Sequence, residues 1–473
     1  MDIKKIVWKK CGALGAEYYS AEGIVYCASP TTPERQCLNI YVPSEYLNSD
    51  GSINSHGVCG GYTAATAPIL YINSIGLYLG KVPYKITESE DTLAGRQGWY
   101  FDYIKRGFVL AFVGARGKDD VDGDGVAVGK APIALADLKA GIRFLRHNKD
   151  NIPGDTDKII SSGMSAGGAM SILIAVSGNS SEFDEYLNAM GAVTDERDDV
   201  YAAQVYCPII DLDHADAAYE FMYLRDNNTI ANSMSDFNKT LSEDLYNEYI
   251  NYFNGRKINA DGVEYRLGED GRSGTFYDYV LEKFIESYRA ENGEKATVPE
   301  YLSSLDSIVA EHNHRSKGCP CFDALFTHDG EGESVECGVF GSRSASKTDG
   351  DFRRHFSPSV TMRIKVLEKR YPDEYEKYYE LYRAQSELEE VKKQVALYNP
   401  YNYIYNGGTD IAGRIRICVG SADSATSIVV SAQLALTLKS LGIDTEYYLM
   451  WGQGHTDADR PGEFISWVDR ISK

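Results

Sequence analysis

The chain has 473 residues, of which 43% are hydrophobic and 25% are charged. This balance is ordinary for a soluble globular protein and excludes a disordered or a collagen-like chain. The 48 basic and 69 acidic residues give a formal net charge of −21, which repels nucleic acids and anionic membrane surfaces. We therefore expect neither nucleic acid nor a membrane as a partner.

The N-terminal segment lacks the apolar core of a signal peptide, and no run of about 18 apolar residues occurs elsewhere. These two features predict a cytoplasmic protein. Nine cysteines are scattered without a CxxC pair, which fits free, mostly buried thiols better than disulfides or a zinc site. Cys319 and Cys321 form the one close pair, and we expect no redox role for them.

Strands and helices alternate through the first 210 residues. The strand segments are almost continuously apolar, which is typical of parallel strands covered by helices on both faces. In chain order we expect strands at 37–43 and 67–76, a helix at 97–107, a strand at 108–117, a helix at 132–149, a strand ending with Ile159 and Ile160, a helix at 169–176, and a strand at 201–210.

This alternation stops over 211–397. The segment is rich in Tyr and Glu and has helical periodicity, as in 372–395, where tyrosines recur at spacings of three and four residues. Strand and helix patterns resume at 414–423, 427–442, 445–452 and 462–472. Because the last strands need the first ones as partners, we interpret 1–210 and 398–473 as one α/β domain and 211–397 as a helical insertion.

The strand that ends near Ile160 leads into a glycine-rich turn. Residues 163–167 read Gly-Met-Ser-Ala-Gly and match GxSxG between a strand and a helix, the context in which this motif marks a nucleophile. The small flanking residues let strand and helix approach closely, and the turn exposes the serine at the carboxyl end of the sheet. We predict that Ser165 is a nucleophile rather than a helix N-cap.

A serine hydroxyl needs a base that removes its proton and a carboxylate that orients the base. His455 follows the last strand in a Gly-rich turn, and Asp423 follows the preceding strand. Both lie at carboxyl ends of strands, where open α/β sheets bind ligands. We predict a triad of Ser165, Asp423 and His455, although Asp423 taken alone could cap the next helix. Asp457 and Asp459 are also near His455, and we expect them to face solvent.

The oxyanion of a tetrahedral intermediate needs two backbone donors. One is expected at Ala166, directly after the nucleophile and at a helix N-terminus. The other is expected in the loop after the strand at 67–76, at Gly76 or Leu77.

His214 is surrounded in sequence by Asp211, Asp213 and Asp216. These residue types could bind a metal, but Asp-rich turns more often cap a following helix. We expect a structural role where the chain enters the insertion.

A second acidic segment begins like a calcium-binding loop, with Asp120, Asp122, Asp124 and Gly125. The position of the bidentate Glu is taken by Ala131, so one essential ligand is missing. We expect a solvated turn there, and we predict no metal and no cofactor for the chain.

Seven segments together resemble the bacterial tannases of the α/β-hydrolase superfamily. They follow the family's order over nearly the whole chain, at 66–80, 163–180, 206–221, 317–325, 414–423, 451–455 and 465–469. The resemblance implies an α/β-hydrolase fold with a large helical lid between the sixth and seventh strands. It also implies hydrolysis of galloyl esters of plant polyphenols, with the same Ser, Asp and His as the triad.

In that family a Lys, a Glu and a second Asp hold the trihydroxyphenyl ring. Lys317 matches the Lys. Glu336 matches the Glu, and a longer preceding segment leaves Glu331 and Glu333 as alternatives. The second Asp stands two residues after the catalytic one, where this chain has Ala425.

The alanine bears on the substrate. A missing charged hydrogen bond weakens binding by about 1.5 to 3 kcal/mol, roughly ten- to a hundredfold. We therefore predict a serine esterase for a small aromatic ester, in which the acyl group is galloyl or a related hydroxybenzoate. Alternatives are an esterase for hydroxycinnamoyl, aliphatic or acetyl esters, a peptidase, or a non-catalytic binding protein that retains the fold. The presence of Ser, Asp and His in the chain order of this fold argues against a non-catalytic binding protein.

Overall fold

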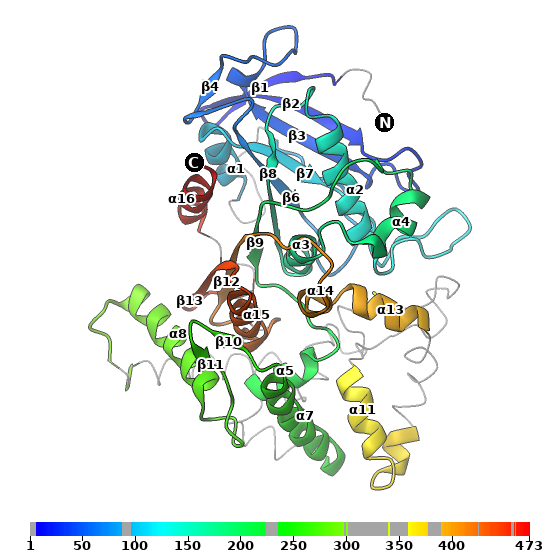
Figure 1. Ribbon diagram of the computed structural model, residues 1–473, viewed down its shortest axis with the longest axis vertical. Coiled ribbons are helices and arrows are strands. Elements are labelled where there is room, and N and C mark those ends of the chain that lie inside the picture. Colours follow the sequence, from blue (N-terminus) through cyan, green and yellow to red (C-terminus); the bar gives the residue numbers. More distant parts are fainter. Residues whose placement is uncertain are drawn as a thin grey trace. The chain divides into compact units, whose positions relative to one another are not determined.

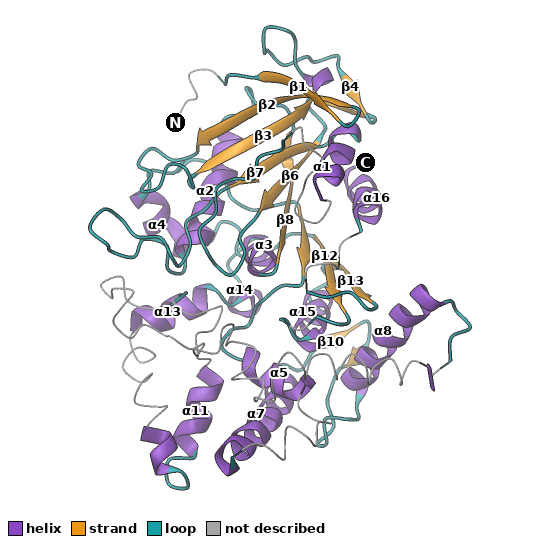
Figure 2. Cartoon of the chain, turned by 180° about the vertical axis from the view of Figure 1, so that it is seen from behind, coloured by secondary structure: helices purple, strands orange, loops and turns teal. Residues whose placement is uncertain are grey.

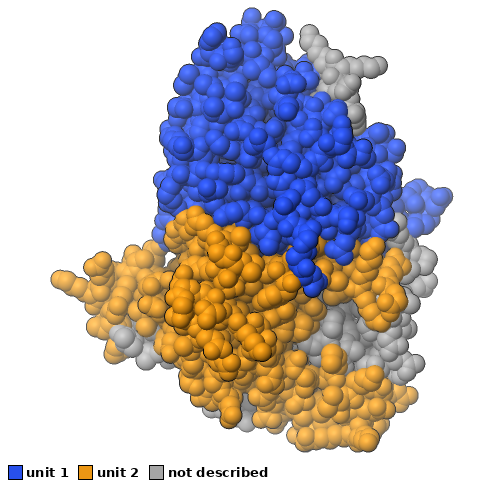
Figure 3. Space-filling view, viewed as in Figure 1, with its two compact units in different colours: residues 1–205, 406–414, 459–473 blue, residues 206–405, 415–458 orange. Residues whose placement is uncertain are grey.

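The computed structural model describes residues 6–87, 96–223, 235–297, 299–300, 339–340, 358–376, 389–423, 425–455, 458 and 460–473. The chain divides into two compact units (Figure 3). Unit 1 comprises Met1–Val205, Asn406–Arg414 and Asp459–Lys473, and unit 2 comprises Tyr206–Tyr405 and Ile415–Ala458. The expected catalytic domain and lid were defined from the order of strands along the chain, whereas the two units are defined by compactness. The expected division therefore stays a prediction.

Unit 1 is built on a sheet whose strands lie in the order β1-β2-β3-β7-β6-β8-β9 (Figures 1 and 2). Their bounds are β1 Lys9–Ala13, β2 Ala16–Val25, β3 Cys37–Pro43, β6 Pro68–Asn73, β7 Val109–Val113, β8 Asp155–Met164 and β9 Ala202–Tyr206. The strands from β1 to β7 in this order pair antiparallel, whereas β6 pairs parallel with both β7 and β8. At the centre, Leu70 lies between Leu110 and Ile160, and all three are fully buried.

Helices cover both faces of this sheet, which confirms the predicted α/β-hydrolase architecture. Their bounds are α1 Arg96–Lys105, α2 Ile133–His147, α3 Ala166–Val176, α4 Asp184–Ala189 and α16 Pro461–Ser472. In both views α1 and α16 lie on one face, and α2 and α4 lie on the other (Figures 1 and 2). Unit 1 also contains two short 3₁₀ helices and a short hairpin, at Ser44–Tyr46, Ser181–Phe183, β4 Val58–Cys59 and β5 Tyr62–Thr63.

Side chains of the C-terminal helix α16 contact residues in and near α1. The Asp469 carboxylate accepts hydrogen bonds from the Tyr62 hydroxyl at 2.8 Å and from Arg106 Nε at 2.6 Å. The Tyr103 and Phe464 rings meet edge to face, with centroids 5.4 Å apart.

Unit 2 contains most of the predicted insertion together with two strands. Its elements are α5 Ala215–Tyr223, α7 Asp236–Gly255, β10 Asn259–Ala260, β11 Val263–Glu264, α8 Thr275–Asn292, α11 Pro358–Val366, α13 Glu389–Leu397, α14 Pro400–Asn406, β12 Arg414–Gly420, α15 Ile428–Ser440 and β13 Asp444–Met450. As the periodicity predicts, the described part of the insertion is mainly helical. In the described part of the chain no helix is both long and apolar enough to cross a membrane.

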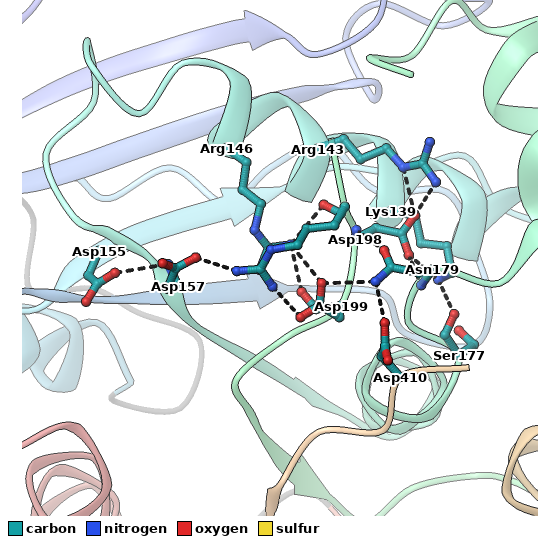
Figure 4. Close-up of polar contacts among 11 residues, drawn as sticks. Lys139, Arg143, Arg146, Asp155, Asp157, Ser177, Asn179, Asp198, Asp199 and Asp410 are labelled. Carbon is teal, nitrogen blue, oxygen red and sulfur yellow. Dashed lines mark hydrogen bonds and ion pairs between the residues drawn. The ribbon is translucent and has the colours of Figure 1, made fainter. Parts of the chain in front are cut away.

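A cluster of charged side chains is buried between α2 and the segment that precedes β9 (Figure 4). Lys139 and Asp198 are fully buried, and Lys139 Nζ donates to Asp198 Oδ1 at 2.7 Å and to the Ser177 carbonyl at 2.6 Å. Arg143, one turn later on α2, donates from Nε to Asp198 Oδ2 at 2.7 Å. The Asn179 amide adds a bond of 2.8 Å to Asp198 Oδ1. Two cations and several donors therefore compensate one buried carboxylate.

Candidate active site

Ser165 occupies the single residue between β8 and α3. Its backbone has φ 60° and ψ −124°, a strained conformation for a residue with a side chain. Its carbonyl accepts the bond from the Ala169 amide at 2.9 Å, while its side chain does not cap the helix. The turn thus has the backbone conformation that a nucleophile elbow requires.

The two flanking glycines are needed for close approach. A Cβ on Gly163 would lie 2.3 Å from the Gly167 carbonyl oxygen, and one on Gly167 would lie 2.5 Å from Asn73 Oδ1. Buried Asn73, at the end of β6, donates from Nδ2 to the Ser162 and Gly167 carbonyls at 3.3 and 3.1 Å. Sequence reasoning missed Asn73, which locks the turn from the neighbouring strand.

The loop after β6 is itself strained. Leu77 and Tyr78 both have left-handed backbone conformations, with φ 57° and 58°. The Tyr78 carbonyl accepts a bond from the Lys118 amide at 2.9 Å, and the Gly80 amide donates to Asp119 Oδ1 at 2.7 Å. The loop is therefore held in place by the segment after β7. Ala166 is the first residue of α3, where helix amides have no intrahelical acceptor. Donation to an oxyanion by Ala166 with Gly76 or Leu77 stays a prediction.

The aspartates considered for calcium serve this region as structural groups. Asp120 pairs with Arg35 and accepts a bond from the Gly117 amide at 2.8 Å. Asp122 Oδ1 accepts bonds from the amides of Asp124 at 3.0 Å and Val126 at 2.9 Å. Asp122 therefore closes its own turn, as the aspartate of an Asx turn does.

In unit 2 the structure brings Asp423 and His455 together. His455 Nδ1 lies 2.9 Å from each carboxylate oxygen of Asp423. The two turns that carry them are joined by backbone bonds, from Ser421 to the Met450 carbonyl at 2.8 Å and from Ala422 to the Gln453 carbonyl at 3.0 Å. The pairing therefore follows from the adjacency of the turns after β12 and β13.

Asp423 is almost completely buried, with 2% of its surface exposed. Its Oδ1 also accepts bonds from the amides of Ala425 at 2.8 Å and Thr426 at 2.9 Å, so it closes its own turn as well as holding the histidine. Burial alone lowers the pKa of His455, but the negative charge of Asp423 outweighs this and holds the pKa well above its ordinary value. The carboxylate therefore stabilises the imidazolium that forms when the ring accepts a second proton. Ser165 belongs to unit 1, and the complete triad stays a prediction.

Sequence reasoning also missed Cys207, which directly follows β9. It is fully buried, and its Sγ donates to the His455 carbonyl at 2.6 Å. Its amide donates to the Cys418 carbonyl at 2.8 Å. The sequence alone carried no sign of this contact, because the two residues are far apart along the chain.

Several predicted residues lie outside the described part of the chain. These are Lys317, Glu336, Glu331, Glu333, Asp457, Asp459, Cys319 and Cys321. Ala425 is described, and its carbonyl accepts a bond from the Tyr219 hydroxyl at 2.7 Å.

The His214 cluster lies at the two ends of the insertion. His214 Nδ1 is 3.6 Å from Asp211 Oδ1 and 3.5 Å from Asp213 Oδ2. Asn399, two residues after the insertion ends, donates from its side-chain Nδ2 to Asp211 at 3.0 Å and to Asp213 at 2.6 Å. Tyr252 of α7 donates to Asp211 Oδ2 at 2.7 Å and stacks on the imidazole with centroids 3.9 Å apart. These contacts support the structural role, since they join the beginning and the end of the insertion.

This cluster predicts a pH-dependent stability. Burial alone lowers the pKa of His214, but Asp211 and Asp213 reverse this and raise it to about 10. The contribution is then complete below the unfolded-state pKa of about 6.5 and is lost as the pH rises through the folded-state pKa. We expect His214→Gln to lower the free energy of unfolding by about 1 to 2 kcal/mol at pH 6.

Urea unfolding of both proteins at pH 6 and at pH 10.5 measures this difference, which should shrink at the higher pH. Comparison with the variant cancels groups that titrate there independently of His214. Burial holds the pKa of Tyr252 well above its ordinary value, and Arg256 keeps its charge throughout. The exposed His56→Gln is the control. A difference of the same size at both pH values would contradict the assignment.

Comparison with known proteins finds an esterase family and several tannase structures. A model of the BD-FAE family, an esterase family of α/β-hydrolase fold, matches residues 96–247. No curated protein sequence matches the chain.

Solved structures are similar over the whole chain. Two structures of tannin acyl hydrolase, one with 3,4-dihydroxybenzoate and one with ethyl gallate, each have a TM-score of 0.79 and 28% identity, covering 100% of this chain and 98% of theirs. The tannase of Fusobacterium nucleatum has a TM-score of 0.76 and 26% identity, covering 100% of this chain and 99% of its own.

Proposed function

From this full-length likeness to bacterial tannases, we propose that the chain is a serine esterase that hydrolyses esters of hydroxylated aromatic acids through an acyl-enzyme. The observation that carries the proposal is the strained backbone of Ser165 between β8 and α3. The contact of His455 with buried Asp423 supports it, because a base oriented by a carboxylate is what such a serine needs.

In the proposed reaction His455 Nε2 removes the proton of Ser165 Oγ as the oxygen attacks the ester carbonyl carbon. The electron pair of the carbonyl moves to its oxygen, and the amides of Ala166 and of Gly76 or Leu77 donate to that oxyanion. When the carbonyl re-forms, the bond to the alcohol breaks and His455 returns the proton to the leaving oxygen. Water then attacks the acyl-enzyme in the same way and releases the acid and Ser165.

Asp423 serves this sequence by accepting the Nδ1 proton. The bond keeps Nε2 free to take the serine proton, and the buried negative charge stabilises the imidazolium that forms. The pKa of His455 is raised for the same reason, because the charge of Asp423 favours the imidazolium over the neutral ring.

The aromatic acyl group is proposed from the related structures, which contain gallate and dihydroxybenzoate groups. We propose that the insertion at 211–397 is a lid that supplies substrate-binding residues, and that Lys317 and Glu336 bind the ring hydroxyls. Tyr219 and Tyr249 of the insertion are almost completely buried and therefore serve packing. Tyrosine abundance by itself therefore does not support an aromatic ligand.

A hydrolysis panel at neutral pH tests the function. Methyl gallate, methyl protocatechuate, methyl ferulate and p-nitrophenyl acetate are offered to the wild type and to Ser165→Ala. Hydrolysis of the first two, lost in the variant, is the expected result. Activity only on the other esters retires the polyhydroxybenzoate assignment, and no serine-dependent activity on any of them favours a binding protein.

Ala425→Asp is expected to improve the binding of methyl gallate. The alanine occupies the position of the family's third ring-binding residue, and a carboxylate there restores a charged hydrogen bond to a ring hydroxyl. We expect KM for methyl gallate to fall by about tenfold or more, with little change for methyl benzoate, which has no ring hydroxyl. Steady-state kinetics of the two esters measure this, and Ala425→Asn is the uncharged control. Equal changes for both esters would contradict a ring contact.

A further inference from the structure

A thiol, a carboxylate and an imidazole lie close together at Cys207, Asp423 and His455. One ligand atom each from Cys207, Asp423 and His455 lies within 4.8 Å of the other two. Cys207 is fully buried and Asp423 is 2% exposed, while the imidazole is 19% exposed. The imidazole is therefore the most exposed member of the cluster.

The thiol is held toward this cluster by its own backbone. Cys207 has a left-handed backbone conformation, with φ 34°. Its amide is fixed to the Cys418 carbonyl at 2.8 Å, and its Sγ points at the His455 carbonyl at 2.6 Å. The side chain thus faces the turn that carries the imidazole.

The donor set suits a thiophilic divalent cation. Thiolate, imidazole and carboxylate are the ligands that Zn²⁺ takes, and three protein ligands leave a fourth tetrahedral position for water. Asp423 Oδ1 is already held by the amides of Ala425 and Thr426, which orients the carboxylate as outer-shell partners of metal ligands do. The 2.9 Å between Nδ1 and Oδ2 needs to widen by only about half an ångström for both atoms to bind zinc.

We propose that Cys207, Asp423 and His455 form a reversible binding site for Zn²⁺ or a similar thiophilic cation, and that its occupation inhibits the enzyme. On binding, the thiol loses its proton to solvent and Sγ bonds to the metal. The imidazole bonds through Nδ1, and its proton moves to Nε2. A ring protonated at Nε2 cannot accept the serine proton, so hydrolysis stops. The inhibition rests on the proposed esterase function, whereas the binding does not.

Binding is tested with Co²⁺ alone on the intact protein. A thiolate ligand gives cobalt an intense sulfur-to-metal charge-transfer band in the near ultraviolet. We expect this band in the wild type and in Cys418→Ser, a matched change of another buried cysteine. We expect its loss in Cys207→Ser and Cys207→Ala, with circular dichroism confirming that the variants are folded. A wild type without the band, or a band that persists in both Cys207 variants, overturns the site.

Inhibition is tested with Zn²⁺ on the best ester of the hydrolysis panel. Each protein is compared with its own metal-free rate. The Zn²⁺ concentration for half-inhibition should rise at least about tenfold in Cys207→Ser and stay unchanged in Cys418→Ser, and EDTA should restore the wild-type rate. Equal sensitivity of Cys207→Ser and the wild type overturns the inhibitory role. If the chain hydrolyses no ester, the Co²⁺ band still decides the binding site separately from the function.

Discussion

Replacing Asp423 with asparagine is expected to lower the kcat of ester hydrolysis by about 10⁴-fold. An asparagine can turn its amide N–H toward Nδ1 of His455, and this favours the tautomer with the proton on Nε2. That tautomer cannot take the proton of Ser165. The loss is larger than the removal of one hydrogen bond would cause, because the base itself is put in the wrong form.

The fold should survive this change, which makes the experiment decisive. The Asn oxygen can still accept the bonds from the amides of Ala425 and Thr426 that Asp423 Oδ1 receives at 2.8 and 2.9 Å. Stopped-flow or steady-state rates give kcat, and thermal melting reports the fold. Asp444→Asn, at the exposed start of β13, is the control for an acidic-to-amide change. A folded Asp423→Asn protein that retains a tenth of the wild-type kcat would exclude Asp423 as the partner of the base.

The second large effect concerns stability. Asp198→Ala is expected to lower the free energy of unfolding by about 3 to 5 kcal/mol, because it leaves Lys139 and Arg143 buried without their carboxylate. Asp157 provides the matched control in the same network, since it pairs with Arg197 at the surface and its side chain is 78% exposed. Asp157→Ala should change the stability by less than about 1 kcal/mol. Urea unfolding of the three proteins at neutral pH measures both values.

The dependence of the unfolding free energy on acidic pH gives an independent check. Burial alone raises the pKa of Asp198, but the charges of Lys139 and Arg143 reverse this and hold it below its ordinary value. A lowered carboxylate pKa stabilises the fold above the unfolded value of about 3.9, and this contribution is lost as the pH falls through the folded value. The difference between the wild type and Asp198→Asn should therefore shrink below about pH 4. If Asp198→Ala costs no more than Asp157→Ala, the buried cluster is not a major source of stability.

Local pattern was enough to predict much of the fold. The nearly continuous apolar runs at 37–43 and 108–117 became the buried strands β3 and β7, and the helix expected at 132–149 became α2. The strands β1 and β2 were not predicted. They lie at the antiparallel edge, where β2 mixes buried and exposed residues without clean alternation, so hydrophobic pattern is weak there.

By itself the sequence determined the elbow at Ser165, because a GxSxG turn between a strand and a helix is a local steric requirement. Only the tertiary structure decided which groups surround the distant candidates. The contact of Asp423 with His455, the thiol of Cys207 beside them and the bridge from Asn73 all join segments separated along the chain. Such contacts depend on which strand ends are neighbours and on which turns exchange backbone bonds. Residue spacing alone does not specify either property.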